Sequence, residues 1–267
     1  IEQAGDDGKT NFPHIDLGSG PDVVRLPGLE LQETLETLHG RYGEEGVIVV
    51  TRSNKRAVLF NGQIRSRVLW QEDDINAGDR LMVVRNDYYW LKEHKELPID
   101  LIANGDMLEV ARIGSRFKRY GHEFAEVDLI LSDFPDYPSF SVTILLSLLH
   151  DPRPSLPQSD SKALYRSIAE DHAGLRTKSA IHKAVISDPC YRALQVKFAY
   201  SLTCHKAQGG QWPAVILDQG YLTEEMLNKD WLRWLYTAFT RAEKELYLLN
   251  FNDQFFTEVS SQTEDIN

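Results

Sequence analysis

The stretch SLTCHKAQGGQW, residues 201–212, decides the fold. A strand-like run ends at Thr203 and breaks into a turn, and a second apolar run, AVILD, begins at Ala214. The turn carries four hydrogen-bonding side chains around two glycines: His205, Lys206, Gln208 and Gln211. A stable loop does not need so many polar side chains around a Gly-Gly pair, so we interpret the turn as part of a binding site.

The segments on both sides of this turn alternate between helical and strand patterns. Upstream, leucines at helical spacing predict a helix that begins near Leu29 and stops at Gly40. The apolar run GVIVVT over 46–51 predicts a buried parallel strand, and residues 53–70 predict a second helix. Nearer the turn, we expect one strand over 195–203, a helix over 229–244 and a strand over 245–251. This alternation predicts an α/β domain with a parallel sheet.

Between these two halves the sequence changes character. Short β-like runs separated by turn residues follow Gly78, three prolines between Asp151 and Pro157 form a linker, and a polar helical stretch runs to about Asp188. We therefore expect an all-β insertion over 78–194, with linker, inside a parent domain formed by 1–77 and 195–267.

Composition sets limits on the partners. The chain has 267 residues with a net charge of −11, which argues against non-specific coating of nucleic acid. A local groove stays possible, because the segment 176–210 contains six basic residues and one acidic residue, although chance clustering on a solvated face explains this equally well. No apolar run is long enough for a membrane span. Cys190 and Cys204 are expected as free thiols in a reducing cytoplasm, and no Cys and His residues have zinc-ligand spacing.

The sequence contains no complete phosphate-binding loop. GDDGKT, residues 5–10, lacks the glycine that the Walker pattern requires, since that position is Gln3. No apolar run ending in Asp-Glu offers a magnesium site either. We expect the chain, which opens at Ile1 with a polar stretch, to be part of a longer protein and to be unable to hydrolyse a nucleotide alone.

The C-terminal helix ends in a group of polar residues. Its apolar and aromatic residues, Trp231 and Trp234 among them, fit a buried helix and by themselves indicate only a core. Thr237, Thr240 and Arg241 share one face near the helix end, from which an arginine can project a permanently charged, planar fork to a phosphate. The alternative is a surface ion pair between this arginine and Glu243 or Glu245.

Taken together, these stretches resemble a known family. YSLTCHKAQGGQW and LYTAFTRAEKELYLL resemble motifs V and VI of superfamily 1 DNA helicases, in the UvrD-like and RecD-like branch. VIVVTRSNKRAVLFN is similar to motif IV of that family. GDRLMVVRNDY and LIANGDMLEV look like the start of an SH3-like insertion. The resemblance implies the second RecA-like domain of a helicase, with a P-loop NTPase fold interrupted by an SH3-like all-β insertion.

The resemblance also implies roles for individual residues. Arg241 occupies the place of the arginine finger that contacts the γ-phosphate of ATP, and Arg52 matches a second arginine that reaches it. Where related chains have an aromatic residue that stacks on adenine, this chain has Thr51. The positions expected to contribute to the nucleotide side of the cleft are Gln208, Gly209, Gln211 and Thr240. The positions expected to contact single-stranded DNA are Thr203, His205, Lys206, Asn86 and Tyr88.

For the β insertion two interpretations remain open. Tyr88, Tyr89 and Trp90 either stack on bases or pack in the core of a small barrel. Residues 104–106, Asn-Gly-Asp, are expected as a turn first and a DNA contact second.

The implied function is the C-terminal half of a cytoplasmic, ATP-dependent helicase that moves along single-stranded DNA. ATP and Mg²⁺ would be bound mainly by the N-terminal RecA-like domain of the same polypeptide. Two alternatives are a non-catalytic module that binds nucleic acid or a protein partner, and an RNA helicase of the same superfamily, since nothing here reads a 2′-hydroxyl.

Overall fold

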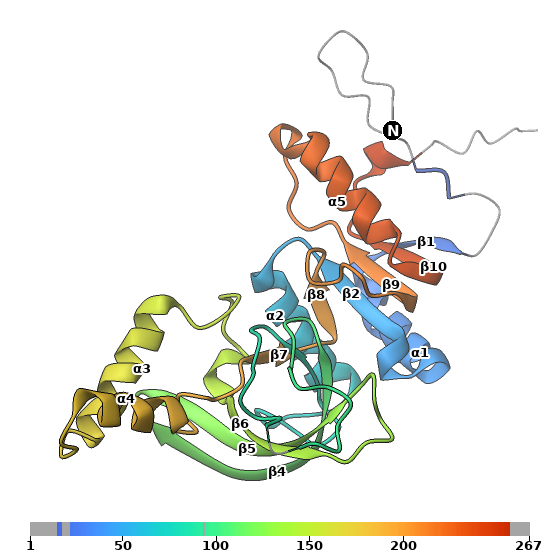
Figure 1. Ribbon diagram of the computed structural model, residues 1–267. Coiled ribbons are helices and arrows are strands. Elements are labelled where there is room, and N and C mark those ends of the chain that lie inside the picture. Colours follow the sequence, from blue (N-terminus) through green and yellow to red (C-terminus); the bar gives the residue numbers. More distant parts are fainter. Residues whose placement is uncertain (1–14, 18–21, 93, 257–267) are drawn as a thin grey trace, which may run out of the picture. The chain divides into compact units, whose positions relative to one another are not determined.

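The chain folds into two compact units. A computed structural model describes residues 15–17, 22–92 and 94–256 (Figure 1). The first unit combines the described residues up to Ser53 with those from Leu202 onwards, and the second runs from Asn54 to Ser201. Residues 54–77, which the sequence placed with the parallel sheet, thus lie in the second unit. The α/β class predicted from the sequence is confirmed.

The first unit is built on a five-stranded sheet in the order β1-β10-β9-β2-β8. Its strands are β1 (Val23–Leu26), β2 (Val47–Thr51), β8 (Ser201–Thr203), β9 (Trp212–Asp218) and β10 (Ala242–Leu249). The pairs β1–β10, β10–β9 and β9–β2 are parallel. Every residue of β2 is buried, as expected for a β-branched run at the centre of a parallel sheet.

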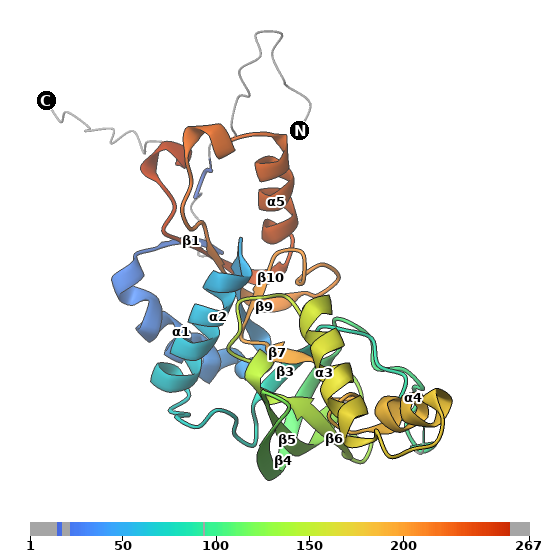
Figure 2. The same ribbon diagram turned by 90° about the vertical axis from the view of Figure 1, so that its left-hand side faces the viewer.

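Two helices cover this sheet. Figure 2 shows α1 (Leu31–Tyr42) and α5 (Lys229–Phe239) on opposite sides of it. The side chain of Asn228 caps α5 by accepting hydrogen bonds from the backbone of Asp230 and Trp231, both at 3.0 Å. The parallel-sheet architecture therefore has a helical layer on each face.

The helix ends differ from those expected. The helix α1 continues through Gly40 and ends before Gly43, whose φ of 72° suits the left-handed region that glycine tolerates. The predicted helix end at Gly40 is wrong. Gly40 has no positive φ that would end the helix, and no atom lies within 4 Å of where its Cβ would be, so the helix passes through it. The C-terminal helix ends at Phe239, so Thr240 and Arg241 lie just beyond it and lead directly into β10.

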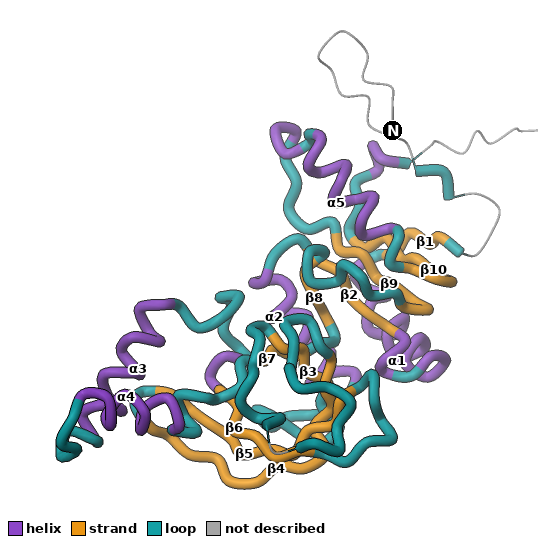
Figure 3. The backbone as a smooth tube through the Cα atoms, in the orientation of Figure 1, coloured by secondary structure: helices purple, strands orange, loops and turns teal. Residues whose placement is uncertain are grey.

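The second unit is built on a five-stranded antiparallel sheet in the order β6-β5-β4-β3-β7 (Figure 3). Its strands are β3 (Arg80–Val83), β4 (Met107–Arg119), β5 (His122–Leu131), β6 (Phe140–Leu145) and β7 (Val196–Phe198). Its helices are α2 (Asn54–Gln63), which continues as a π-helical turn η3 (Ile64–Val68), and the pair α3 (Gln158–Asp171) and α4 (Lys178–Ser187). Short 3₁₀ turns in the two units cover Gly28–Glu30, Glu44–Gly46, Leu146–Leu148, Glu224–Met226 and Asp253–Phe255.

The strand expected over 195–203 is divided between the two sheets. The chain leaves β7 at Phe198 and enters β8 at Ser201. The amide group of Asn61 fixes this break, because it donates to the carbonyls of Phe198 (3.1 Å) and Ser201 (3.0 Å) and accepts from the Ser201 N–H (2.8 Å). These bonds replace the ladder that an unbroken strand would make, so the single-strand prediction is wrong.

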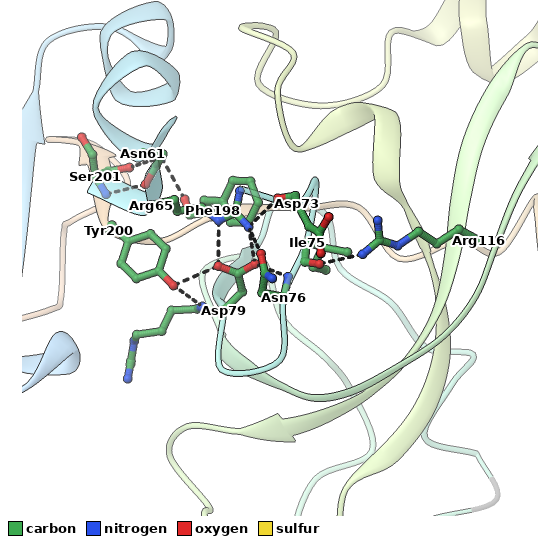
Figure 4. A network of polar contacts seen from close by, with 11 residues as sticks. Asn61, Arg65, Asp73, Ile75, Asn76, Asp79, Arg116, Phe198, Tyr200 and Ser201 are labelled. Carbon is green, nitrogen blue, oxygen red and sulfur yellow. Dashed lines mark hydrogen bonds and ion pairs between the residues drawn. The ribbon is translucent and has the colours of Figure 1, made fainter. Parts of the chain in front are cut away.

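A buried ion pair anchors the start of the second unit (Figure 4). The guanidinium of Arg65 donates from Nε and Nη2 to the two carboxylate oxygens of Asp79, both at 2.8 Å, and the two side chains are 4% and 0% exposed. Asp79 also accepts from the Asn76 N–H at 2.7 Å and from the Tyr200 hydroxyl at 3.1 Å. The network joins the π-helical turn η3 to the start of β3, through Asp79, and to the end of β7, through Tyr200. These bonds hold residues 61–79 in the second unit.

The GDDGKT stretch and Ile1 lie outside the described residues. Within the residues that the structure does describe, every helix is too short or too polar to cross a bilayer.

Candidate functional site

The candidate site lies in the first unit where β2 and β8 end. Arg52 follows β2 directly, and the polar turn 204–211 follows β8, which is the neighbouring strand. The Cys204 N–H donates to the Thr51 carbonyl at 3.0 Å, so the start of the turn is fixed beside Arg52. The structure therefore brings together the predicted motif IV and motif V residues.

The turn owes its shape to a carbonyl and two glycines. The carbonyl of Thr203 accepts from the N–H groups of Lys206 (2.8 Å) and Ala207 (3.0 Å), which curls the chain at once after the strand. Gly209 has a φ of 86°, which favours glycine. A Cβ at Gly210 would lie 2.3 Å from the Trp212 ring, so only glycine leaves room for that ring.

The predicted polar residues of the turn differ in exposure. His205, Gln208 and Gln211 are exposed, whereas Thr203 and Lys206 are partly buried. Burial lowers the pKa of Lys206 below its usual value. Three side chains of the turn are thus accessible to a ligand, and the ammonium of Lys206 is partly withdrawn from water.

Arg241 contacts this turn directly. Its Nη1 donates to the Gly210 carbonyl at 3.0 Å, its Nε to the Thr237 carbonyl at 3.0 Å and its Nη2 to the Thr240 hydroxyl at 3.0 Å. The structure therefore joins Arg241 of the predicted motif VI to the predicted motif V turn, through Gly210, a residue that the sequence did not single out. The sequence alone does not show that a Cβ at position 210 would lie against the Trp212 ring, which is what makes Gly210 necessary for the shape of the turn.

The surface ion pair considered for Arg241 is not formed. No carboxylate among the described residues pairs with its guanidinium. Glu245 is engaged elsewhere, because it accepts from Arg41 and from the hydroxyls of Tyr42 (2.6 Å) and Tyr247 (2.6 Å). Burial alone would raise the pKa of Glu245, but these three hydrogen bonds outweigh it and keep the pKa below the usual value.

Arg52 rests on an aromatic ring of α5. Its guanidinium carbon lies 5.4 Å from the centroid of the Trp234 ring, within the range of a cation–π contact. The Trp234 carbonyl accepts a weak hydrogen bond from the Cys204 thiol at 3.6 Å. Burial raises the pKa of this thiol to about 11, so Cys204 is a structural thiol here and not a nucleophile. Cys190 is also free and buried.

The predicted DNA-contacting residues of the second unit have separate surroundings. Tyr88 is exposed (62%), and the Asn86 side chain accepts from the Asn104 N–H at 2.8 Å. Trp90 donates from Nε1 to the Arg192 carbonyl at 2.8 Å and meets the Tyr89 ring edge-on at 5.3 Å. Of the three aromatic residues, Trp90 and Tyr89 are held in packing contacts and Tyr88 stays accessible.

Asn86 and Tyr88 line a groove of about 600 Å³ within the second unit. Its other polar lining residues are Arg85, Asp87, Asn104, Ser161, Tyr191, Arg192 and Gln195. Residues 104–106 form the expected turn, with Gly105 at a φ of 108°. On strand β4 of the same unit, Arg112 and Lys118 form exposed ion pairs with Asp128 and Glu123.

The two arginines suit phosphate binding better than metal binding. Within the described part of the chain, no three His, Cys, Asp or Glu side chains form a group that could hold a metal ion. Arg52 Nη1 is buried without a hydrogen-bond partner. This N–H donor is therefore free to bind an anionic ligand.

In the first unit, Arg52 follows the end of β2, the polar turn leads into the start of β9, and Arg241 precedes the start of β10, so the two arginines flank opposite ends of the parallel strands. The family profile described as "UvrD-like helicase C-terminal domain" matches residues 198–249, which contain the turn, α5 and Arg241. This match confirms, over these residues, the resemblance predicted from the sequence.

Two solved helicase structures are similar to this chain. The chain is similar to Pif1 helicase from Candida albicans, with 14% identity over 79% of this chain and 46% of that chain and a TM-score of 0.41. It is also similar to Pif1 helicase from Bacteroides in complex with ADP-AlF3 and ssDNA, with 10% identity over 79% of this chain and 42% of that chain and a TM-score of 0.40. The chain thus spans less than half the length of these helicases. Among curated protein sequences, none matches the chain significantly.

Proposed function

We propose that this chain is the C-terminal motor part of an ATP-dependent superfamily 1 DNA helicase. In this proposal the N-terminal RecA-like domain of the same polypeptide holds ATP and Mg²⁺. This chain supplies Arg241 and Arg52 to the γ-phosphate. The whole enzyme couples hydrolysis to movement along single-stranded DNA and to duplex unwinding.

The observation that carries the proposal is the environment of Arg241. Its guanidinium is held by two carbonyls and a hydroxyl, and these neutral acceptors orient the fork without cancelling its charge. Phosphoryl transfer spreads negative charge over equatorial oxygens, and a fixed guanidinium stabilises that charge. A residue used only for stability would be expected to pair with a carboxylate such as Glu245.

The same turn connects the nucleotide to the strand. Arg241 bonds to the carbonyl of Gly210 in this turn and to the hydroxyl of Thr240. Gln208, Gly209, Gln211 and Thr240 are proposed to contribute to the nucleotide side. Thr203, His205 and Lys206 precede them and are proposed to face the DNA. A change at Arg241 on hydrolysis would thus move the backbone of the turn that grips the strand, which is how closure and opening of two domains can drive stepping.

In the second unit, Asn86 and Tyr88 are proposed to contact single-stranded DNA. Tyr88 offers an exposed ring for base stacking, which is tolerant of sequence. Neither contact distinguishes DNA from RNA, so the strand preference needs a direct measurement.

The test is ATP hydrolysis by the full-length protein with no nucleic acid, with single-stranded DNA and with single-stranded RNA. We expect turnover that DNA stimulates, and no turnover by residues 1–267 alone under the same conditions. A full-length protein that binds strands but does not hydrolyse ATP would instead favour the non-catalytic module, and stimulation by RNA alone would favour an RNA helicase.

A further inference from the structure

Two tryptophans of α5 occupy different environments. Trp231 is 2% exposed and stacks on Phe255, with ring centroids 5.0 Å apart, so it belongs to the core. Trp234 is only partly buried and its ring lies under the guanidinium of Arg52. The sequence suggested core packing for both, and the structure assigns that role to Trp231 only.

Arg52 depends on this ring for its position. Its side chain makes no hydrogen bond or ion pair within the described residues, and the Trp234 ring is its one aromatic contact there. An arginine side chain has many rotamers, so an unpaired one would sample a wide space. The flat ring face restricts the guanidinium to a plane above α5.

The pair also leaves hydrogen-bonding capacity unused. Arg52 Nη1 and Trp234 Nε1 are both buried and both lack a partner. Buried donors without partners are rare in proteins, and two on neighbouring side chains indicate a site prepared for an acceptor. The thiol of Cys204 bonds to the Trp234 carbonyl, which ties this part of α5 to the polar turn.

From this geometry we infer that Trp234 is a positioning residue, which holds Arg52 over its ring so that the guanidinium meets an anionic phosphate. The inference rests on the proposed function. It adds a residue that acts through Arg52 and does not itself react.

A direct test measures the Arg52 side chain in residues 1–267 by NMR, with no nucleotide required. The Arg52 Nε–Hε signal should be shifted by the ring current of Trp234. Trp234→Leu should move this signal towards the position of a free arginine, and Trp234→Phe should retain most of the shift. Tyr236→Leu is the matched control, because it removes an exposed aromatic ring from the same helix.

The functional test is a double-mutant cycle in the full-length protein. Trp234→Leu should lower kcat by about tenfold with little change in KM, since it loosens a group used in the transition state. Combined with Arg52→Ala, it should add almost nothing to the loss caused by Arg52→Ala alone. Trp234→Phe should restore most of the rate, and Tyr236→Leu should leave it unchanged.

Two results would overturn the inference. One is an Arg52 signal that Trp234→Leu leaves in place. The other is a full additive loss in the double variant, which means that Trp234 acts independently of Arg52. If Arg241→Ala abolishes turnover and Arg52→Ala lowers it while Trp234→Leu does not affect it, the inference fails and the proposed function stands. If Arg241→Ala has no effect, the proposed function itself fails.

Discussion

Removing one partner of the buried pair Arg65–Asp79 should strongly destabilise the second unit. In Asp79→Leu the guanidinium of Arg65, 4% exposed, loses both carboxylate bonds, and the Asn76 N–H and Tyr200 hydroxyl lose an acceptor. Leaving a buried charge without its partner costs about 3–5 kcal/mol. For a unit of this size that corresponds to a fall in melting temperature of roughly 10 °C.

The assay is calorimetry on residues 1–267, with hydrogen exchange to locate the loss. We expect the amides of β3 and β7 to lose protection first, because Asp79 precedes β3 and Tyr200 follows β7. The double variant Arg65→Met/Asp79→Leu should recover much of the loss, since it leaves no unpaired charge. Lys118→Ala, which removes an exposed ion pair from the same unit, is the matched control and should change nothing measurable. A loss below about 1 kcal/mol in Asp79→Leu would refute the reasoning, because it would equal that of an exposed pair.

Two further predictions concern single residues. Gly210→Ala should destabilise the first unit by about 1–3 kcal/mol, because the new methyl group meets the Trp212 ring at 2.3 Å. Gly40→Ala in α1, where no atom lies within 4 Å, should instead stabilise this unit by up to about 1 kcal/mol. Urea unfolding of both variants measures the difference. Burial lowers the pKa of Lys197 to about 8, below the roughly 10.4 of an unfolded chain, so the unfolded state binds more protons between these values. The free energy of unfolding should therefore rise with pH in this window, by up to about 1.4 kcal/mol per pH unit relative to Lys197→Met. If plots of the free energy of unfolding against pH run parallel for the two proteins between about pH 8 and 10, the prediction is contradicted.

The parts of the fold that the sequence predicted are those with strong local patterns. The run 47–51 is buried over its whole length because only a central parallel strand hides an unbroken β-branched segment. The polar turn after Thr203 is recognisable from the sequence because it carries more hydrogen-bonding side chains than a stable loop requires. The short edge strand β1 was missed, since Val23–Leu26 is brief and half-exposed and resembles an ordinary loop.

Other features depend on residues that are distant in the chain. The break between β7 and β8 is made by Asn61, and no local pattern in 195–203 reveals an amide that arrives from α2. Likewise, the motif alone could not decide between a finger and an ion pair for Arg241, because Glu245 is occupied by Arg41 and Tyr42 from α1.

The role of Trp234 was accessible in principle. It lies two helical turns before Arg241, so the two residues share a side of the same segment. The sequence could therefore place Trp234 on the same side of this segment as Arg241. What it could not supply is Arg52, which reaches the ring from the end of β2.

The central claim is that Arg241 acts on the transferred phosphate, and single-turnover ATP hydrolysis by the full-length protein tests it most directly. At saturating ATP and single-stranded DNA, Arg241→Ala should lower the hydrolysis rate by about 10³–10⁵ while ATP affinity, strand affinity and melting temperature stay near those of the wild type. Arg241→Lys should recover little, because an ammonium does not reproduce the planar fork. Arg233→Ala, a change at an exposed arginine of the same helix, should keep the wild-type rate. A stably folded Arg241→Ala protein that hydrolyses ATP at the wild-type rate would contradict the account.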